Sequence, residues 1–119
     1  MKILIVDDNA AVRRVIRYTV TDLAAEVIEC VDGDEVLSQY QKHLPDLVLM
    51  DIRMPRTDGL TATHQLRRSY PQAKVIMVSD IDDASTRSLA FQYGACGYVL
   101  KNNLTGLDEA ILDALDMRH

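Results

Sequence analysis

Four short runs of largely apolar residues dominate the hydrophobic pattern, and each run ends in a polar side chain. Runs of this length without polar interruption are typical of parallel strands buried on both faces. The segment Glu26–Cys30 is less apolar, so we expect a further strand there at an edge of the sheet. The four apolar strands are predicted over Lys2–Val6, Leu47–Met50, Val75–Val78 and Gly97–Leu100.

Between the strands, five segments carry apolar residues at helical spacing. The predicted helices are Asn9–Leu23, with Asn9 as N-cap, Gly33–Leu44, Gly59–Ser69, Asp82–Tyr93 and Leu104–Met117. The fourth helix, capped by Asp82 or Asp83 and ended by Gly94, has the weakest apolar stripe, so we expect it to be the loosest. The residues predicted to face the core are Val12, Val15, Ile16, Val20, Leu23, Val36, Leu37, Tyr40, Leu44, Leu60, Thr63, Leu66, Leu104, Leu107, Ile111 and Leu115.

Five strand–helix units without a linker or an internal repeat indicate one α/β domain over residues 1–119. A chain of this length can bury a real hydrophobic core. No apolar run approaches the roughly 20 residues of a membrane span. The N-terminus enters a strand directly and lacks a signal-peptide cleavage site, so we predict a cytoplasmic protein that does not contact membranes.

Charge and cysteine content narrow the classes of function further. The net charge of −5 argues against direct nucleic-acid binding by this domain, because phosphate contacts need clustered lysine and arginine. Cys30 and Cys96 have no metal-binding spacing and lie in or beside apolar segments. We predict that both are buried free thiols rather than a disulfide.

The polar residues that end the strands are the candidate chemistry. The first strand ends in Asp7 and Asp8, the third in Asp51, the fourth in Ser79 and the fifth in Lys101. Open α/β sheets bind ligands beyond the carboxyl ends of their strands. Three carboxylates converging there repel one another and raise at least one pKa unless a hard cation such as Mg2+ is bound.

These motifs together resemble a response-regulator receiver, the phosphoacceptor domain of two-component signalling, over essentially the whole chain. The matching residues are Asp7-Asp8, Asp51 with Met54-Pro55 and Asp58-Gly59, Ser79, and Gly97-Tyr98 with Lys101. The stretch 97–102 looks most like receivers attached to helix-turn-helix transcription factors. The resemblance implies a flavodoxin-like doubly wound (βα)5 fold with a parallel sheet in the order 2-1-3-4-5.

The resemblance also implies a function. A sensor histidine kinase, or a small phosphodonor, transfers a phosphoryl group to Asp51 in a Mg2+-dependent reaction. The domain is then no enzyme in the ordinary sense but a phosphoacceptor that catalyses its own phosphorylation and dephosphorylation. For the metal, the resemblance assigns direct ligation to Asp8, Asp51 and the backbone carbonyl of Arg53, with Asp7 acting mainly through water.

Two further residues are assigned to a conformational switch by the same resemblance. Ser79 hydrogen-bonds the new phosphoryl group, and Tyr98 turns inward as Ser79 moves. Lys101 supplies a second positive charge at the phosphoryl group. We expect phosphorylation to shift Ser79 and Tyr98 together with the fourth helix and to promote a homodimer.

Three positions depart from the family pattern. Asn102 stands where a cis proline is usual, so we expect a trans peptide bond after Lys101. Asp80 replaces a small residue, and Arg53 replaces a shorter one. We predict that Arg53 and Asp80 pair and gate the mouth of the pocket. The alternative is that Asp80 shares the capping of the fourth helix with Asp82 and Asp83.

Other functions fit the sequence less well. A flavodoxin-like cofactor binder needs a hydroxyl- or glycine-rich phosphate loop after the first strand, where this chain has Asp7-Asp8-Asn9. A phosphohydrolase of the haloacid-dehalogenase type needs a second aspartate at the position of Asn9. An interaction module that works without phosphorylation would keep the fold but has no use for the complete acidic cluster.

Overall fold

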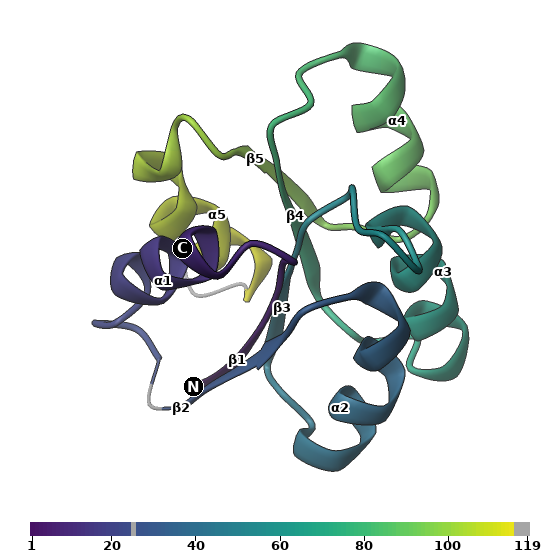
Figure 1. The fold of residues 1–119 in the computed structure, drawn as a ribbon, viewed down its shortest axis with the longest axis horizontal. Helices are drawn as coiled ribbons and strands as arrows, with labels where there is room; N and C mark the ends of the chain where they lie inside the picture. Colours follow the sequence, from purple (N-terminus) through teal and green to yellow (C-terminus); the bar gives the residue numbers. More distant parts are fainter. Residues whose placement is uncertain (25, 116–119) are drawn as a thin grey trace.

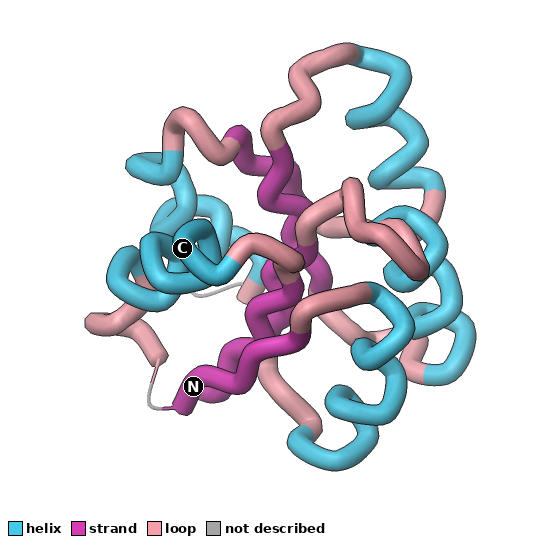
Figure 2. Tube along the Cα trace, viewed as in Figure 1, coloured by secondary structure: helices cyan, strands magenta, loops and turns pink. Residues whose placement is uncertain are grey.

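The computed structural model describes residues 1–24 and 26–115, and over these ranges the chain forms a five-stranded parallel sheet with helices on both faces (Figures 1 and 2). The strand order is β2-β1-β3-β4-β5, and every neighbouring pair is parallel. The predicted topology and the edge position of β2 are both confirmed. The strands are β1 (Lys2–Val6), β2 (Glu26–Cys30), β3 (Leu47–Met50), β4 (Val75–Ser79) and β5 (Gly97–Leu100).

Helices α1 and α5 cover one face of the sheet, and α2, α3 and α4 cover the other (Figure 1). This is the doubly wound arrangement expected from the alternation of strands and helices. None of the described helices is long and apolar enough to cross a membrane. The helices are α1 (Ala10–Thr19), α2 (Val36–His43), α3 (Gly59–Ser69), α4 (Ala84–Gln92) and α5 (Leu107–Ala114), with single 3-10 turns η1 (Gly33–Glu35) and η2 (Leu104–Gly106) before α2 and α5.

The hydrophobic core has two layers because alternate strand residues face opposite sides of the sheet. Leu4, Val48 and Met77 lie in the layer beneath α2, α3 and α4. Ile5, Leu49 and Ile76 lie in the layer beneath α1 and α5. All six side chains are fully or almost fully buried, which explains why the strand sequences contain no polar alternation.

The first helix begins as predicted but is shorter. The Asn9 side chain accepts hydrogen bonds from the backbone N–H groups of Ala11 and Val12 at 2.9 and 3.1 Å, so the predicted N-cap is confirmed. The helix ends at Thr19 and not at Leu23. The prediction that Val15 faces the core is wrong, since its side chain is 52% exposed. The buried stripe of this helix runs through Ile16, and Val15 lies about 100° of helix rotation away from it, on the solvent side.

The second helix shows the same kind of error at two positions. The prediction that Leu37 and Leu44 are buried is wrong, because they are 38% and 64% exposed. Val36 is buried and Tyr40 packs against the core, and these two residues, four apart, form the inward stripe. Leu44 adopts the left-handed conformation with φ of 47° and ends the helix instead of extending it.

The remaining helix predictions hold more closely. The bounds of α3 are those predicted. Asp83 caps α4 by accepting a hydrogen bond from the N–H of Thr86 at 2.7 Å, and Gly94 follows with φ of 115°, a conformation that favours glycine. Helix α5 is buried through Leu107 and Ile111, and its predicted end at Met117 lies outside the described residues.

Both cysteines are free thiols, but only one is buried. Cys30 lies at the end of β2 in the core, where burial raises its pKa to about 12. The prediction that Cys96 is buried is wrong, because it lies in the turn just before β5 with its side chain exposed. The peptide bond between Lys101 and Asn102 is trans, as predicted.

Candidate functional site

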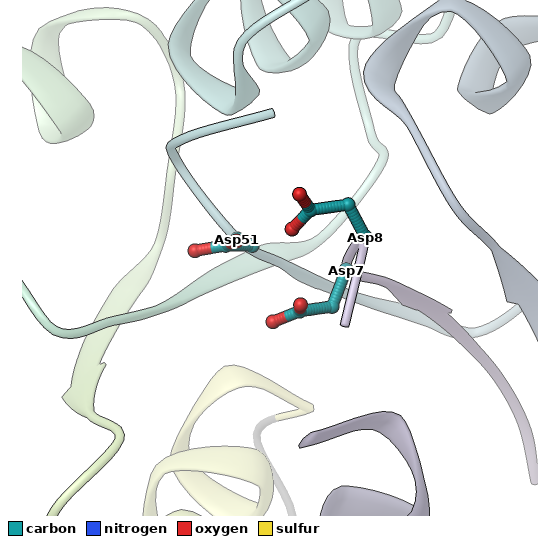
Figure 3. Close-up of side chains that lie close together, drawn as sticks. All are labelled: Asp7, Asp8 and Asp51. Atoms are coloured by element: carbon teal, nitrogen blue, oxygen red, sulfur yellow. The ribbon is translucent and has the colours of Figure 1, made fainter. Parts of the chain in front are cut away.

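Three aspartates meet at the carboxyl ends of the two central strands β1 and β3. The N–H of Asp51 donates to the carbonyl of Val6 at 2.9 Å, which aligns the ends of the two strands. Each of Asp7, Asp8 and Asp51 offers a carboxylate oxygen, and these oxygens lie within 4.8 Å of one another (Figure 3). Asp7 and Asp51 are only 1% and 4% exposed, whereas Asp8 is exposed to solvent. The predicted cluster therefore forms, with one solvent-facing carboxylate and two buried ones.

The ammonium group of Lys101 lies between the two buried carboxylates. Its Nζ is 2.9 Å from Asp7 Oδ2 and 3.1 Å from Asp51 Oδ1. The N–H of Lys101 donates to the carbonyl of Ser79 at 2.8 Å, which fixes the backbone at the end of β5. Burial by itself lowers the pKa of Lys101, but its contacts with Asp7 and Asp51 outweigh this effect and raise the pKa. The lysine therefore stays positively charged at neutral pH.

Asp51 is an unusually basic carboxylate. Burial and the negative charge of Asp7 raise its pKa to about 6, against the opposing effects of Lys101 and a 2.8 Å hydrogen bond from the N–H of Ile52. Asp51 is still ionised at neutral pH, but its charge is poorly stabilised. A more basic oxygen is a better nucleophile than an ordinary aspartate, provided that it is deprotonated.

The donor set fits a hard divalent cation. Three carboxylates face a single ammonium group, so the cluster keeps an excess of negative charge in a largely buried setting. Asp7 Oδ1 accepts a hydrogen bond from the N–H of Asn9 at 2.9 Å. Asp7 Oδ2 is fully buried and, apart from its ion pair with Lys101, has no hydrogen-bond partner among the residues described. Oxygen ligands with excess negative charge are what Mg2+ selects.

Ser79 and Tyr98 are connected through one residue that they both contact. Ser79 is completely buried, and its Oγ accepts a hydrogen bond from the N–H of Ile81 at 3.0 Å. The Tyr98 hydroxyl donates to the carbonyl of the same Ile81 at 2.7 Å. The tyrosine ring is half-buried, with the Arg87 guanidinium 4.6 Å from its centroid. Ile81 therefore links the hydroxyl at the end of β4 to the aromatic ring on β5.

Comparison with known proteins identifies the family. Residues 3–112 match the family model described as the response regulator receiver domain. The chain belongs to this family. It is a receiver domain of two-component signalling, as the motifs of its sequence indicated.

Curated relatives of the receiver differ in how much of their length it covers. The chemotaxis protein CheY of Bacillus subtilis strain 168 is 39% identical over 101 residues, which cover 84% of each chain. Response regulator GacA of Pseudomonas aeruginosa is 36% identical over 113 residues, which are 93% of this chain and 52% of that protein. The probable transcriptional regulator ycf27 of Porphyridium aerugineum is 34% identical over 100 residues, 84% of this chain. The receiver spans only about two fifths of that regulator's length.

Solved structures confirm the receiver fold independently. A two-component response regulator of the LuxR family from Aurantimonas sp. SI85-9A1 superposes with a TM-score of 0.91 at 29% identity, covering 99% of this chain and 86% of the other. The response regulator domain of Thermotoga maritima CheB superposes with a TM-score of 0.88 at 25% identity, covering 100% of this chain and 98% of the other. The predicted likeness to receivers of transcription factors is confirmed by the LuxR-family and ycf27 relatives.

Arg53 and Asp80 lie close enough to form an ion pair. Arg53 lies in the loop after Asp51, and Asp80 directly follows Ser79. Arg53 Nη2 is 3.7 Å from Asp80 Oδ1, and the two side chains are 70% and 65% exposed. The N-cap of α4 is Asp83 alone among these aspartates. The geometry therefore favours the pairing of Arg53 with Asp80 over the alternative in which Asp80 caps the helix.

Two residues of the site region have little or no recognisable signal in the sequence. Ile81 contributes only its backbone N–H and carbonyl to the contacts with Ser79 and Tyr98, and any residue type offers those groups. Asp32 is 1% exposed and binds the loop that follows Asp51. Its only signal is that it follows a strand, as Asp7 and Asp51 do, and precedes a glycine.

Proposed function

We propose that this receiver accepts a phosphoryl group on Asp51 from a sensor histidine kinase, or from a small phosphodonor, in a Mg2+-dependent reaction. The observation that carries the proposal is the position of the Lys101 ammonium between the carboxylates of Asp7 and Asp51, beside Asp8. The ycf27 relative, named as a probable transcriptional regulator, supports a role of this receiver in the control of transcription.

Each residue of the cluster has a distinct task in this proposal. An oxygen of Asp51 attacks the phosphorus atom, the bond from phosphorus to the leaving group breaks, and an acyl phosphate forms. Lys101 holds a positive charge where the phosphoryl oxygens would lie. Asp8, Asp51 and the backbone carbonyl of Arg53 would hold Mg2+, with Asp7 acting mainly through water. When bound, the cation would offset the negative charge of the phosphoryl group.

Intact-mass spectrometry tests the proposal directly. Incubation with acetyl phosphate and Mg2+ should add the mass of one phosphoryl group to the protein. Addition of EDTA before the donor should prevent this. An unchanged mass in the presence of Mg2+ would rule out phosphorylation by this small phosphodonor and favour an interaction module that works without phosphorylation.

The contacts of Ile81 suggest how phosphorylation could reach the surface. If Ser79 Oγ turns to bond the phosphoryl group, it releases the N–H of Ile81. The Tyr98 hydroxyl is bonded to the carbonyl of that same residue, so a movement of Ile81 would change the position of the Tyr98 ring. We infer that Ser79 and Tyr98 form the switch and that α4, which buries only Ala90, moves with them.

The switch is expected to promote a homodimer. Light scattering should give the monomer mass for the receiver with Mg2+ alone and a larger mass after addition of beryllofluoride, which mimics the acyl phosphate. The variant Asp51→Asn should remain monomeric under both conditions. Equal masses for the wild-type receiver with and without beryllofluoride would contradict the dimer but leave phosphorylation of Asp51 untouched.

We further propose that the ion pair of Arg53 and Asp80 gates access to Asp51. Asp80 adds negative charge at the mouth of an acidic pocket and opposes an anionic donor, while Arg53 offsets that charge. Because both side chains are exposed, the pair contributes at most about 1 kcal/mol, which limits the effect on rates to roughly fivefold. Asp80→Ala should therefore speed labelling by acetyl phosphate, and Arg53→Ala should slow it.

Two further variants sharpen the test of the gate. The double variant Arg53→Ala/Asp80→Ala should depart from the sum of the single effects, because the two residues are in contact. Asp82→Ala is the matched control, since Asp82 lies in the same loop and pairs with Arg87 at 3.7 Å. Wild-type labelling rates in both single variants would show that Asp80 and Arg53 do not control access to Asp51.

A further inference from the structure

A buried carboxylate outside the acidic cluster binds the loop that carries Arg53. Asp32 follows β2 and is 1% exposed. Its Oδ2 accepts a hydrogen bond from the N–H of Arg56 at 2.9 Å, and its Oδ1 accepts from the N–H of Thr57 at 2.8 Å. A third and longer bond, 3.3 Å, comes from the N–H of Asp34 in its own turn. The two shorter bonds thus join segments 24 and 25 residues apart in the sequence.

Capping the following 3-10 turn does not account for this arrangement. The turn has three residues and needs only the bond from Asp34. Burial by itself raises the pKa of Asp32, yet the bonds from Arg56, Thr57 and Asp34, together with the charge of Arg56, lower it below its ordinary value. The charged form is therefore bound tightly by backbone N–H groups of the loop after Asp51.

The neighbouring Gly33 shows how closely the two segments meet. A Cβ atom at this position would lie 2.4 Å from the carbonyl oxygen of Thr57, so no larger residue fits without displacing the loop. Outside the buried contact, Arg56 Nε donates to Asp34 Oδ2 at 2.7 Å. The loops that follow β2 and β3 are thus hydrogen-bonded to each other at the carboxyl edge of the sheet (Figure 2).

The loop held by Asp32 has a second anchor beside Asp51. The N–H of Gly59 donates to the carbonyl of Ile52 at 2.7 Å, which closes the base of the loop. A Cβ atom on Gly59 would lie 1.9 Å from the carbonyl oxygen of Asp51. Between the base at Ile52 and the bonds at Arg56 there remain three residues, and the first of them is Arg53. Hydrogen bonds at Ile52 and at Arg56 thus restrain the backbone on both sides of Arg53.

We propose that Asp32 is a positioning residue of the phosphorylation site: by binding the N–H groups of Arg56 and Thr57, it holds the Arg53 carbonyl in place for Mg2+. This inference rests on the proposed function, which assigns that carbonyl to the metal. Asp32 touches neither the cluster nor the reacting atoms, so it acts through the loop alone.

Asp32→Asn tests the proposal with little change in shape. The asparagine oxygen keeps an acceptor for Thr57 and Asp34, but its NH2 group meets the N–H of Arg56 as a second donor. Residues that orient metal ligands typically change metal affinity by about 10- to 100-fold when they are replaced. We expect the Mg2+ dissociation constant, measured by calorimetry on the folded variant, to rise about 10-fold or more.

Asp34→Asn is the matched control because Asp34 lies two residues away and pairs with the exposed side chain of Arg56. Its Mg2+ dissociation constant should stay within about twofold of the wild-type value, as expected for loss of an exposed ion pair. A purely structural role of Asp32 would lower the melting temperature of Asp32→Asn and leave its Mg2+ affinity unchanged. That result would overturn the proposal.

Hydrogen exchange of the wild-type receiver supplies a test that does not depend on a variant folding. Coupling between two sites is reciprocal, so Mg2+ should slow exchange of the Arg56 and Thr57 amides. Unchanged exchange of both amides at saturating Mg2+ would also overturn the proposal. If the wild-type receiver binds no Mg2+ at all, the proposed function itself fails; if it binds Mg2+ and these amides do not respond, only the role of Asp32 fails.

Discussion

Replacing Asp51 with asparagine is expected to abolish incorporation of the phosphoryl group from acetyl phosphate. The amide has no ionisable oxygen to attack phosphorus, while its size and its hydrogen-bonding oxygen are nearly those of the carboxyl group. Intact mass should show one added phosphoryl group on the wild-type protein and none on the variant. Asp108→Asn, an exposed aspartate on α5, should be labelled like the wild type.

Labelling of Asp51→Asn at the wild-type rate would assign the acceptor to another residue. A loss of labelling is informative only if the variant is folded, and the pKa of Asp51 gives that control. In the folded protein without metal this pKa is about 6, against an ordinary value of 3.8. Between about pH 4 and pH 6 the folded state therefore keeps a proton that the unfolded chain has lost.

The sign of the resulting effect on stability is fixed. The unfolding free energy of the wild-type protein in EDTA should fall as the pH rises from about 4 to about 6, by at most about 3 kcal/mol. Above about pH 6 it should stay at the lower value. Asparagine lacks this ionisation. Urea unfolding in EDTA should therefore show Asp51→Asn to be more stable than the wild type at pH 7.5, with the difference shrinking toward pH 4. A variant that is less stable at pH 7.5 would contradict the raised pKa.

The sheet was predictable because burial on both faces leaves a local signature in the sequence. Strand β3, Leu47–Met50, is apolar throughout, and its end at Asp51 is marked by the first polar residue. Asp7 and Asp51 follow the neighbouring strands β1 and β3, and the carboxyl ends of all strands in a parallel sheet lie at one edge. Lys101 follows β5 at the same edge, and its long side chain spans the end of β4 to reach both carboxylates.

Helix faces and helix ends were less predictable. Val15 and Leu37 are apolar but lie one position away from a better-placed residue, and propensity alone does not decide which of two neighbours is buried. Leu44 ends α2 in a left-handed conformation that glycine or asparagine usually adopts, so a leucine there does not predict the end of the helix. Cys96 is exposed because it lies in the turn before β5 and not in the strand itself.

Parts of the site that depend on backbone groups were not predictable from residue types. Ile81 joins Ser79 to Tyr98 through its N–H and its carbonyl, and its side chain carries no hint of that role. Asp32 accepts a hydrogen bond from the backbone N–H of Arg56, 24 residues further along the chain. Arg53 and Asp80, in contrast, were predictable as a pair because they carry opposite charges and lie in the loops that follow the neighbouring strands β3 and β4.

Metal affinity separates the roles of the paired aspartates at the end of β1. Asp8 is exposed and is assigned direct ligation, whereas Asp7 is buried, ion-paired with Lys101 and assigned contact mainly through water. Asp8→Ala should therefore weaken Mg2+ binding severely, by more than about 100-fold. Asp7→Ala should weaken it less, within the 10- to 100-fold range typical of residues around a metal site. Calorimetric titration of both variants with Mg2+ measures the difference.

The buried position of Asp7 could by itself disturb the fold, so the comparison needs a control for structure. After Asp7→Ala, Lys101 keeps Asp51 as an ion-pair partner at 3.1 Å, and the remaining buried pair is balanced in charge. We therefore expect Asp7→Ala to fold and to retain the far-ultraviolet dichroism of the wild type. Because removing Asp7 also removes a charge that raises the pKa of Asp51, that pKa should fall in this variant. Tighter Mg2+ binding by Asp8→Ala than by Asp7→Ala would reverse the two assignments and make the buried aspartate the direct ligand.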